Sequence, residues 1–239
     1  MPEEVCLIGM GGNLGDVPAA IASAVAAFAD DPAIRVVAVS SLVRTRPMAT
    51  SAGQDFLNAA LRLETAQPPE ILLAKCHAIE AAHARRRDRH WGPRSLDLDL
   101  LTHGEAVSDD STLRLPHPGC WWRRFVLDPV IEIALEIIHP TAGESFNALR
   151  DRLLPRPLPI AFDYAPSAAW QAALLERLGS LAAEISLETP SSEVALHFVQ
   201  NPAINNPETR QLGLPESPEA ALDAAEAILV AALDSPRPT

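Results

Sequence analysis

Two aspartates near the middle of the chain have the type and spacing of metal ligands. Asp97 and Asp99 alternate with leucines in the segment 95–100, a pattern typical of a β-strand with one apolar face. Residues two apart in a strand point to the same side, so both carboxylates are expected on one face. Hard oxygen ligands of this kind suit Mg²⁺, which takes one or two protein carboxylates and completes its shell with water and substrate phosphates. The spacing therefore predicts a site for a metal-bound nucleotide.

An arginine tract leads into these carboxylates. It contains Arg85, Arg86, Arg87 and Arg89, and the sequence Trp91-Gly92-Pro93-Arg94 joins it to the strand. By itself, an alternating Asp-Leu strand is equally typical of a half-solvated sheet edge. Crowded guanidinium groups repel one another unless an anion compensates them, so the tract favours a polyphosphate site over a plain charged surface.

Composition narrows the classes of function. The chain has 239 residues, 48% of them hydrophobic, which is enough for one sizeable domain with an extension. Its net charge of −12 argues against a general nucleic-acid binder, because affinity for a phosphate backbone needs a broad basic surface. Lys75 is the only lysine, which excludes a Walker A loop. If ATP binds, arginines must hold its phosphates.

Cysteine usage and the apolar segments indicate the compartment. Cys6, Cys76 and Cys120 are far apart and form no C-x-x-C pair, so we expect buried free thiols rather than a zinc site or disulfides. The first residues lack the basic and apolar regions of a signal peptide. No apolar run is long enough to span a bilayer. We expect a cytoplasmic enzyme with no membrane or nucleic-acid partner, and no motif identifies a protein partner.

Hydrophobic periodicity predicts an α+β fold. Strands are expected at 5–10, 35–43, 56–65 and 95–102, and helices at 17–29, from about 68 to the arginine tract, and at 127–138. The order β-α-β-β-α-β is that of a ferredoxin-like sandwich, in which an antiparallel sheet carries two helices on one face. The candidate site residues then lie mostly in loops and at strand ends.

The last third of the chain is expected to be a separate, mainly helical extension. We predict a catalytic domain over residues 1–149, a stiff proline-rich linker over 150–166 and an accessory segment over 167–239. Apolar stripes predict helices at 170–185 and 218–233. The accessory segment shows no catalytic motif. The pair Trp121-Trp122 is a candidate surface for its docking.

Four segments in order resemble the 6-hydroxymethyl-7,8-dihydropterin pyrophosphokinase family. They are Gly11-Gly12-Asn13-Leu14-Gly15-Asp16; Thr45-Arg46-Pro47 with Gln54-Asp55-Phe56-Leu57-Asn58; Glu80 with the tract 85–99; and Pro116-His117-Pro118 with Arg123 and Phe125. The resemblance covers roughly residues 5–140. It implies transfer of pyrophosphate from ATP to a pterin alcohol in folate biosynthesis, with AMP as the other product.

The resemblance also implies roles for individual residues. Those expected around the pterin are Thr45, Pro47, Met48, Phe56, Asn58, Trp91 and Phe125. Those expected around ATP are Glu80, Arg85, Arg86, Trp91, Arg94, Leu100, His117 and Arg123. The implied catalytic residues are Arg85, Arg86, Asp97 and Asp99, of which the two aspartates hold two Mg²⁺ ions. Two aromatic faces and an edge-reading amide are what a flat, polar heterocycle requires.

Some positions depart from the family pattern, and other interpretations stay open. Ala84 replaces a common glycine, the arginine loop is about one residue shorter than in well-known relatives, and Thr112 and Arg114 occur in reversed order. Glu80 is also typical of a surface ion-pair partner. A nucleotide-binding paralogue without turnover, or an extension that is a second folate enzyme, are the alternatives. Formation of AMP and a truncation near Arg150 would separate them.

Overall fold

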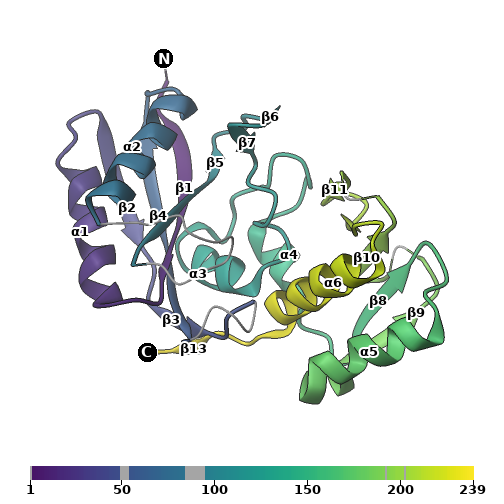
Figure 1. Cartoon of the computed structure of the whole chain (residues 1–239). Helices are drawn as coiled ribbons and strands as arrows, with labels where there is room; N and C mark the ends of the chain where they lie inside the picture. Colours follow the sequence, from purple (N-terminus) through teal and green to yellow (C-terminus); the bar gives the residue numbers. More distant parts are fainter. Residues whose placement is uncertain (1, 49–53, 84–94, 192, 202) are drawn as a thin grey trace.

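An antiparallel sheet forms the first part of the molecule. The computed structural model describes residues 2–48, 54–83, 95–191, 193–201 and 203–239. The sheet is built from β1 (Glu4–Gly12), β2 (Ile34–Val39), β3 (Val43–Thr45), β4 (Phe56–Thr65), β5 (Asp97–His103) and β13 (Arg237–Pro238). The strand order is β13-β3-β4-β1-β5, and β2 also pairs with β4. The α+β class is confirmed for this part, and the order of its elements differs from the predicted one in having three strands rather than two between α1 (Val17–Ala29) and α2 (Pro69–Ala82) (Figure 1).

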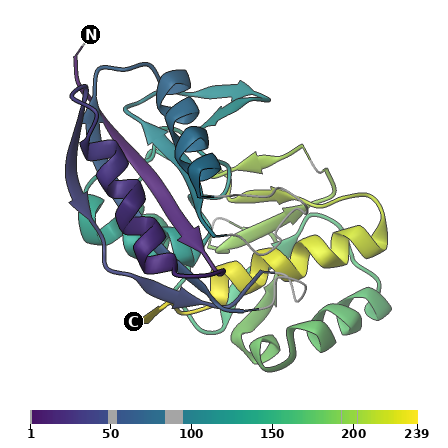
Figure 2. The same cartoon turned by 60° about the vertical axis from the view of Figure 1, so that its left-hand side comes forward.

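The two faces of this sheet carry different partners. Helices α1 (Val17–Ala29) and α2 (Pro69–Ala82) cover one face, where Ile8, Leu61 and Leu98 belong to their core. Helix α3 (Arg124–Ala134) and the C-terminal region pack on the other face against Leu7, Ala60 and Leu101. Figure 2 shows α1 and α2 side by side on their face of the sheet. Burial on both faces fixes the register of the central strands.

Local sequence explains the elements that agree with prediction. The Asp16 carboxylate accepts a hydrogen bond from the Ala19 N–H at 3.0 Å and caps α1. Apolar residues at helical spacing, from Val17 to Phe28, face the sheet. The predicted bounds of this helix and of β4 are confirmed.

Two predicted elements differ from the structure. The strand expected at 35–43 is divided into β2 and β3, and between them the Ser40 Oγ, rather than a backbone carbonyl, accepts the Ala60 N–H at 2.8 Å. The helix expected at 127–138 is α3, which begins at Arg124 and ends at Ala134. Beyond it the chain turns and forms the short helix α4 (Phe146–Asp151).

The prediction of a mainly helical C-terminal extension is wrong. This region contains a five-stranded mixed sheet with the order β11-β12-β10-β8-β9. Its strands are β8 (Leu158–Phe162), β9 (Ile185–Glu188), β10 (Leu196–Val199), β11 (Asn205–Asn206) and β12 (Gln211–Gly213). Its helices are α5 (Ala168–Leu178), the 3₁₀ helix η2 (Gly179–Glu184) and α6 (Pro218–Leu233). Strands of two to five residues are too short to show a clear period in sequence, and β8 lies in the segment expected to be a linker.

The two sheets share one hydrophobic core. Trp121 and Trp122 are buried in it with residues of α3, β8, β10 and α6. The Trp121 Nε1–H donates to Asn205 Oδ1 at 2.7 Å. The tandem tryptophans therefore dock the C-terminal region, as the sequence predicted. Within the described residues, no helix is long and apolar enough to cross a membrane.

A buried ion-pair network joins α3 to α4. Arg124 donates from Nε and Nη2 to the two oxygens of Asp128 at 3.0 and 2.7 Å. The Arg150 Nε–H donates to the same carboxylate at 3.2 Å. Arg124 is only 5% exposed, so its charge depends on this partner.

Asp128→Ala should lower the free energy of unfolding by about 3 kcal/mol, because it leaves the buried Arg124 without its carboxylate. Urea unfolding measures the change. The matched control is Asp151→Ala, which removes the more exposed partner of Arg150 and should cost less than about 1 kcal/mol. Equal effects of the two variants would show that the network does not depend on burial.

Candidate active site

The two aspartates begin strand β5 and share one face of the sheet. Asp97 pairs with Gly11 and Asp99 with Gly9 on the neighbouring strand β1. Both aspartates are half-buried, whereas Leu96, Leu98 and Leu100, which alternate with them, are buried under the helices of the opposite face. The residues that the structure describes contain no group of three or more His, Cys, Asp and Glu side chains placed to hold a metal ion. The arrangement offers two oxygen donors, the number that Mg²⁺ commonly takes from a protein.

A glycine separates this carboxylate pair from a buried amide. Gly11 pairs with Asp97 on one side and with Asn58 of β4 on the other, so the three residues form a row across three strands. A Cβ atom at position 11 would lie 2.7 Å from Asn58 Oδ1, closer than real Cβ atoms approach. Only glycine leaves the Asn58 side chain in this place.

Asn58 is held by a residue of the next strand. Its Nδ2 donates to Thr45 Oγ1 at 2.8 Å, and both side chains are buried. Phe56, two residues before Asn58, lies on the same face and is half-buried. The structure thus brings together three residues that the sequence assigned to the pterin: Thr45, Phe56 and Asn58.

Three further residues expected around the pterin lie just after β3 or on α3. Pro47 and Met48 follow β3, and Met48 packs against the shared core, as does Phe125 near the start of α3. Phe125 is half-buried. The Arg123 guanidinium carbon lies 5.8 Å from the centre of its ring and 4.8 Å from that of Trp122, in cation–π range.

His117 lies in the loop that precedes α3 and is tied to β5. Its backbone N–H donates to the Leu101 carbonyl at 2.8 Å, and the Gly119 N–H donates to its Nδ1 at 3.1 Å. Burial lowers the pKa of His117, the Arg123 charge lowers it further, and Asp99 opposes both effects. The ring is therefore neutral near pH 7, and Nε2 carries the proton because Nδ1 is an acceptor.

Glu80 supports β5 from the opposite side. Its side chain is buried on α2, and Oε1 accepts the backbone N–H of Leu98 at 2.9 Å. The bonded residue lies between the two aspartates, so the glutamate holds the strand that carries them. Its burial does not fit a surface ion-pair partner.

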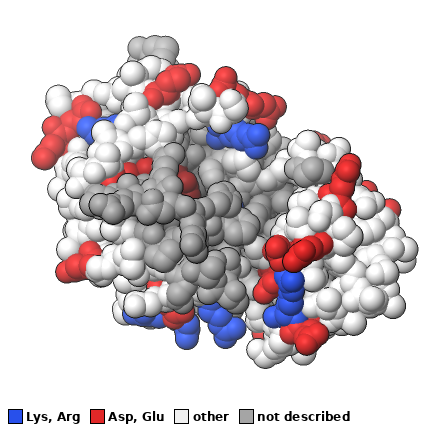
Figure 3. Space-filling model, in the orientation of Figure 1, with Lys and Arg blue, Asp and Glu red and all other residues white. Residues whose placement is uncertain are grey.

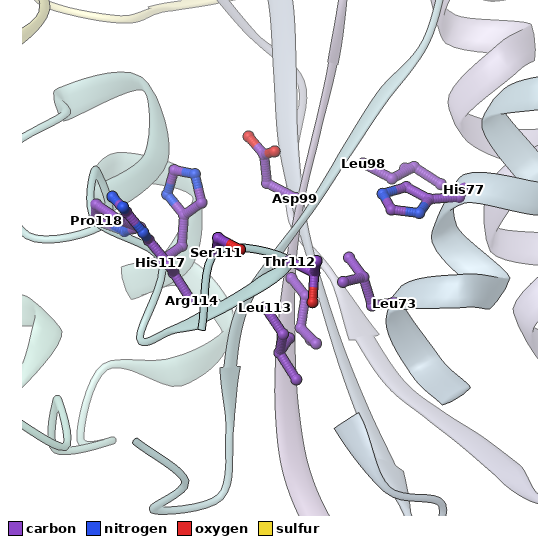
Figure 4. A pocket seen from close by; sticks show the side chains of 11 residues that line it. Leu73, His77, Leu98, Asp99, Ser111, Thr112, Leu113, Arg114, His117 and Pro118 are labelled. Atoms are coloured by element: carbon purple, nitrogen blue, oxygen red, sulfur yellow. The ribbon is translucent and has the colours of Figure 1, made fainter. Parts of the chain in front are cut away.

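A pocket of about 390 Å³ opens beside Asp99. Its walls come from α2, from β5, from the hairpin of β6 (Ser108–Asp110) and β7 (Leu113–Leu115), and from the His117 loop. Figure 4 shows Asp99 near the middle, with His117 on one side of it and Leu73 and His77 of α2 on the other. The lining of the pocket is mixed, because leucines and a proline alternate with histidine, serine, threonine, arginine and aspartate side chains, so the pocket offers many hydrogen-bonding groups to a polar ligand. Of the residues assigned to ATP, Leu100 and His117 line this pocket.

Several lining residues were not predicted. Leu73, His77, Ser111 and Leu113 carry no motif, and Leu73 and His77 are ordinary positions of an amphipathic helix. Leu73 and His77 are four residues apart, so they lie on one face of the helix. This spacing is the only sign in the sequence that the two belong together. Four predicted site residues, Arg85, Arg86, Trp91 and Arg94, lie outside the described residues. In Figure 3 the described charged side chains on this face are scattered in small groups rather than gathered in one basic field.

The buried cysteines contribute no reactive thiolate. All three are free and buried, as predicted. Cys120 Sγ lies 3.2 Å from Nε2 of His139, whose Nδ1 accepts the Ala142 N–H at 3.1 Å. Burial raises the pKa of Cys120 to about 12 and lowers that of His139 to about 4, so both groups are neutral at pH 7. The pair is a structural contact rather than a nucleophile with its base.

This histidine makes stability depend on pH in a defined direction. Its folded-state pKa of about 4 lies below the ordinary value of 6.5, so the unfolded chain binds the proton first as pH falls. Stability should therefore decrease between pH 6.5 and 4, by up to about 3 kcal/mol from this group. Urea unfolding across this range should show a shallower decrease for His139→Gln than for the unmodified chain. Parallel curves for the two proteins would contradict the assignment.

The family model for 7,8-dihydro-6-hydroxymethylpterin-pyrophosphokinase matches residues 7–135. The 2-amino-4-hydroxy-6-hydroxymethyldihydropteridine pyrophosphokinase of Methylorubrum extorquens is 44% identical over 148 residues, which are 62% of this chain and 92% of that protein. The protein of the same name from Synechocystis is 35% identical, over 62% of this chain and 75% of the relative. The folic acid synthesis protein fol1 of Schizosaccharomyces pombe is 31% identical over 63% of this chain, and the match spans 21% of its length.

A solved structure agrees at the level of the fold. The HPPK-DHPS of Plasmodium falciparum with pteroate superposes with a TM-score of 0.50 at 9% identity, over 84% of this chain and 56% of that chain. The family model, in contrast, rests on sequence and covers more than half of the chain, including Asn58, Asp97, Asp99 and His117. On this ground the chain belongs to the 7,8-dihydro-6-hydroxymethylpterin pyrophosphokinase family, the ATP-dependent pyrophosphokinases of folate biosynthesis.

Proposed function

We propose that the family reaction takes place where the amide of Asn58 and the carboxylate of Asp97 meet on one face of the sheet. The reaction moves pyrophosphate from ATP to the hydroxymethyl oxygen of the dihydropterin and releases AMP. The observation that carries this proposal is the row Asn58, Gly11, Asp97 across β4, β1 and β5. Strands are about 4.8 Å apart, so the backbones that carry a pterin-reading amide and a metal-binding carboxylate lie about 10 Å apart, with a glycine between them in the row.

Asp97 and Asp99 fit the requirements of a Mg²⁺ site. They are half-buried on one face, and they offer charged oxygens beside a pocket. We propose that they hold the two Mg²⁺ ions expected from the sequence. When bound, the metal neutralises charge on the polyphosphate and orients it. Glu80 positions these ligands through the Leu98 N–H, from the opposite side of the strand.

The pocket beside Asp99 is proposed to receive the nucleoside part of ATP. Its apolar wall includes Leu73 and Leu113, and its polar groups include His77 and Thr112. The neutral His117 presents its Nε2–H as a hydrogen-bond donor, and Arg123 supplies a permanent positive charge for the phosphates. Arg85, Arg86 and Arg94 remain expected phosphate ligands, and Trp91 the expected cover of the site.

The pterin is proposed to bind at the other end of the row. The Nδ2 of Asn58 is engaged by Thr45, which leaves Oδ1 beside Gly11 as an acceptor for a ring N–H or amino group. Phe56 and Phe125, both half-buried, are the proposed stacking residues. Most of the rate enhancement then comes from holding the hydroxyl oxygen and the phosphate in line, as in other phosphoryl transfers.

Asp97→Asn should reduce AMP formation by on the order of 10³-fold, because it removes a charged ligand while keeping the shape of the side chain. AMP is measured by chromatography with ATP, Mg²⁺ and the hydroxymethyl dihydropterin. Asp223→Asn, which changes an exposed aspartate of α6, serves as the control and should retain activity. Production of ADP would contradict pyrophosphoryl transfer, and full activity of Asp97→Asn would contradict the proposed metal site.

Gly11→Ala should raise the KM for the pterin about tenfold, because the new Cβ displaces the Asn58 amide. The KM for ATP should change little. Gly9→Ala is a matched control on the same strand and face, since its Cβ would meet only Leu101 at 3.4 Å, an ordinary contact. The two variants are compared by steady-state kinetics with each substrate varied. Equal KM values for the pterin would refute the role of this glycine.

A further inference from the structure

The C-terminal region lies beyond the part of the chain that the family model matches, yet it touches both sides of the proposed active site. The matched part ends at residue 135. Strand β13 nevertheless pairs with β3 in the first sheet, with Arg237 opposite Arg44 and Pro238 opposite Val43. Figure 1 shows this last strand beside β3, far along the chain from it.

On the pterin side, the aspartate that follows α6 contacts the residue that follows β3. The Arg46 N–H donates to Asp234 Oδ2 at 2.7 Å, and the Asp234 side chain is only 12% exposed. The adjoining Thr45 is the residue that holds the Asn58 amide. Arg237 also pairs with Asp55, the residue before Phe56, at 3.3 Å. The last turn and tail thus hold the residues on either side of the proposed pterin contacts.

The helix that carries Asp234 is itself firmly held. Leu229, Ala232 and Leu233 of α6 are buried in the shared core. The Leu233 carbonyl accepts a hydrogen bond from Arg156 Nη2 at 3.0 Å. The position of the Asp234 carboxylate is therefore set by packing rather than by a free chain end, so it can fix the strand that it touches.

On the nucleotide side, an asparagine of the C-terminal region contacts the loop that carries His117. Asn205 of β11 accepts from the Trp121 Nε1–H at 2.7 Å and donates from Nδ2 to the Pro118 carbonyl at 2.8 Å. These two partners lie on either side of Gly119, in the loop that carries His117 and Arg123. The side chain spans the loop and uses both its donor and its acceptor, so replacing it loses two hydrogen bonds.

We propose that the C-terminal region positions the active site through two separate contacts. Asp234 sets β3 and the Asn58 amide for the pterin, and Asn205 sets the loop of His117 and Arg123 for ATP. Both are positioning residues, because each contacts the neighbour of a proposed substrate contact, and this inference rests on the function proposed above. The region is thereby a working part of the pyrophosphokinase.

The test is a comparison of two variants in the full-length chain. Asp234→Ala should raise the KM for the pterin about three- to tenfold and leave the KM for ATP within about twofold. Asn205→Ala should raise the KM for ATP by a similar factor and leave the KM for the pterin within about twofold. Asp234→Asn keeps an oxygen for the Arg46 N–H and should restore most of the pterin KM. Asp223→Ala removes another aspartate of α6, paired with Arg177, and should alter neither KM.

The alternative outcomes are distinct. If each variant changes both KM values equally and lowers the thermal midpoint, the contacts stabilise the fold and the positioning role is overturned. Unchanged KM values in both variants overturn it as well. If the unmodified chain forms no AMP, the proposed function fails instead. The positioning role is then tested by calorimetry: Asp234→Ala should weaken binding of the pterin alone, and Asn205→Ala binding of ATP alone.

Discussion

The antiparallel register of β1 between β4 and β5 is the constraint on which the site depends. It aligns Asn58, Gly11 and Asp97 across three strands, and a slip by one residue would turn each to the opposite face. The register is held by burial on both faces of the sheet. Ile8 and Leu61 face the helices α1 and α2, whereas Leu7, Ala60 and Leu101 face α3 and the C-terminal region. The pairing of β1 with β4 and β5 therefore determines both the placement of the site residues and the packing of the core.

The site lies where an apolar face of this sheet becomes polar. Along β5, the buried Leu101 is followed toward the strand start by the half-buried Asp99 and Asp97. Partial burial keeps the carboxylates accessible to a hydrated ion, and Asp99 lines a pocket of mixed polar and apolar side chains. His117, held neutral at the border of this pocket, adds a donor without adding charge. Arginine and metal would thus neutralise the charge of the substrate phosphates, and the pocket would accommodate the shape of the substrate.

Sequence reasoning succeeded where a pattern is long and local. The α1 helix and β4 have clear periods and end signals, and the Asp-Leu alternation of β5 placed both carboxylates on one face. It failed in the C-terminal sheet, whose short strands are held by parallel pairing with distant segments, such as β8 with β10. Nothing in the sequence indicated that Glu80, expected as an ATP contact, supports β5, because the Leu98 N–H that it accepts lies on another element. His77 shows the same limit, since only the fold brings it to the pocket.

The pairing of β13 with β3 also concerns the order in which the chain is synthesised. Every residue of the proposed site precedes residue 126, but β3 receives its second neighbour only from residues 237 and 238. A chain emerging from the ribosome can thus bury the helices against β1 and β4 early, while the three-residue strand beside Asn58 has pairing on one side alone. The first sheet has all of its described strands only when residues 237 and 238 have been made.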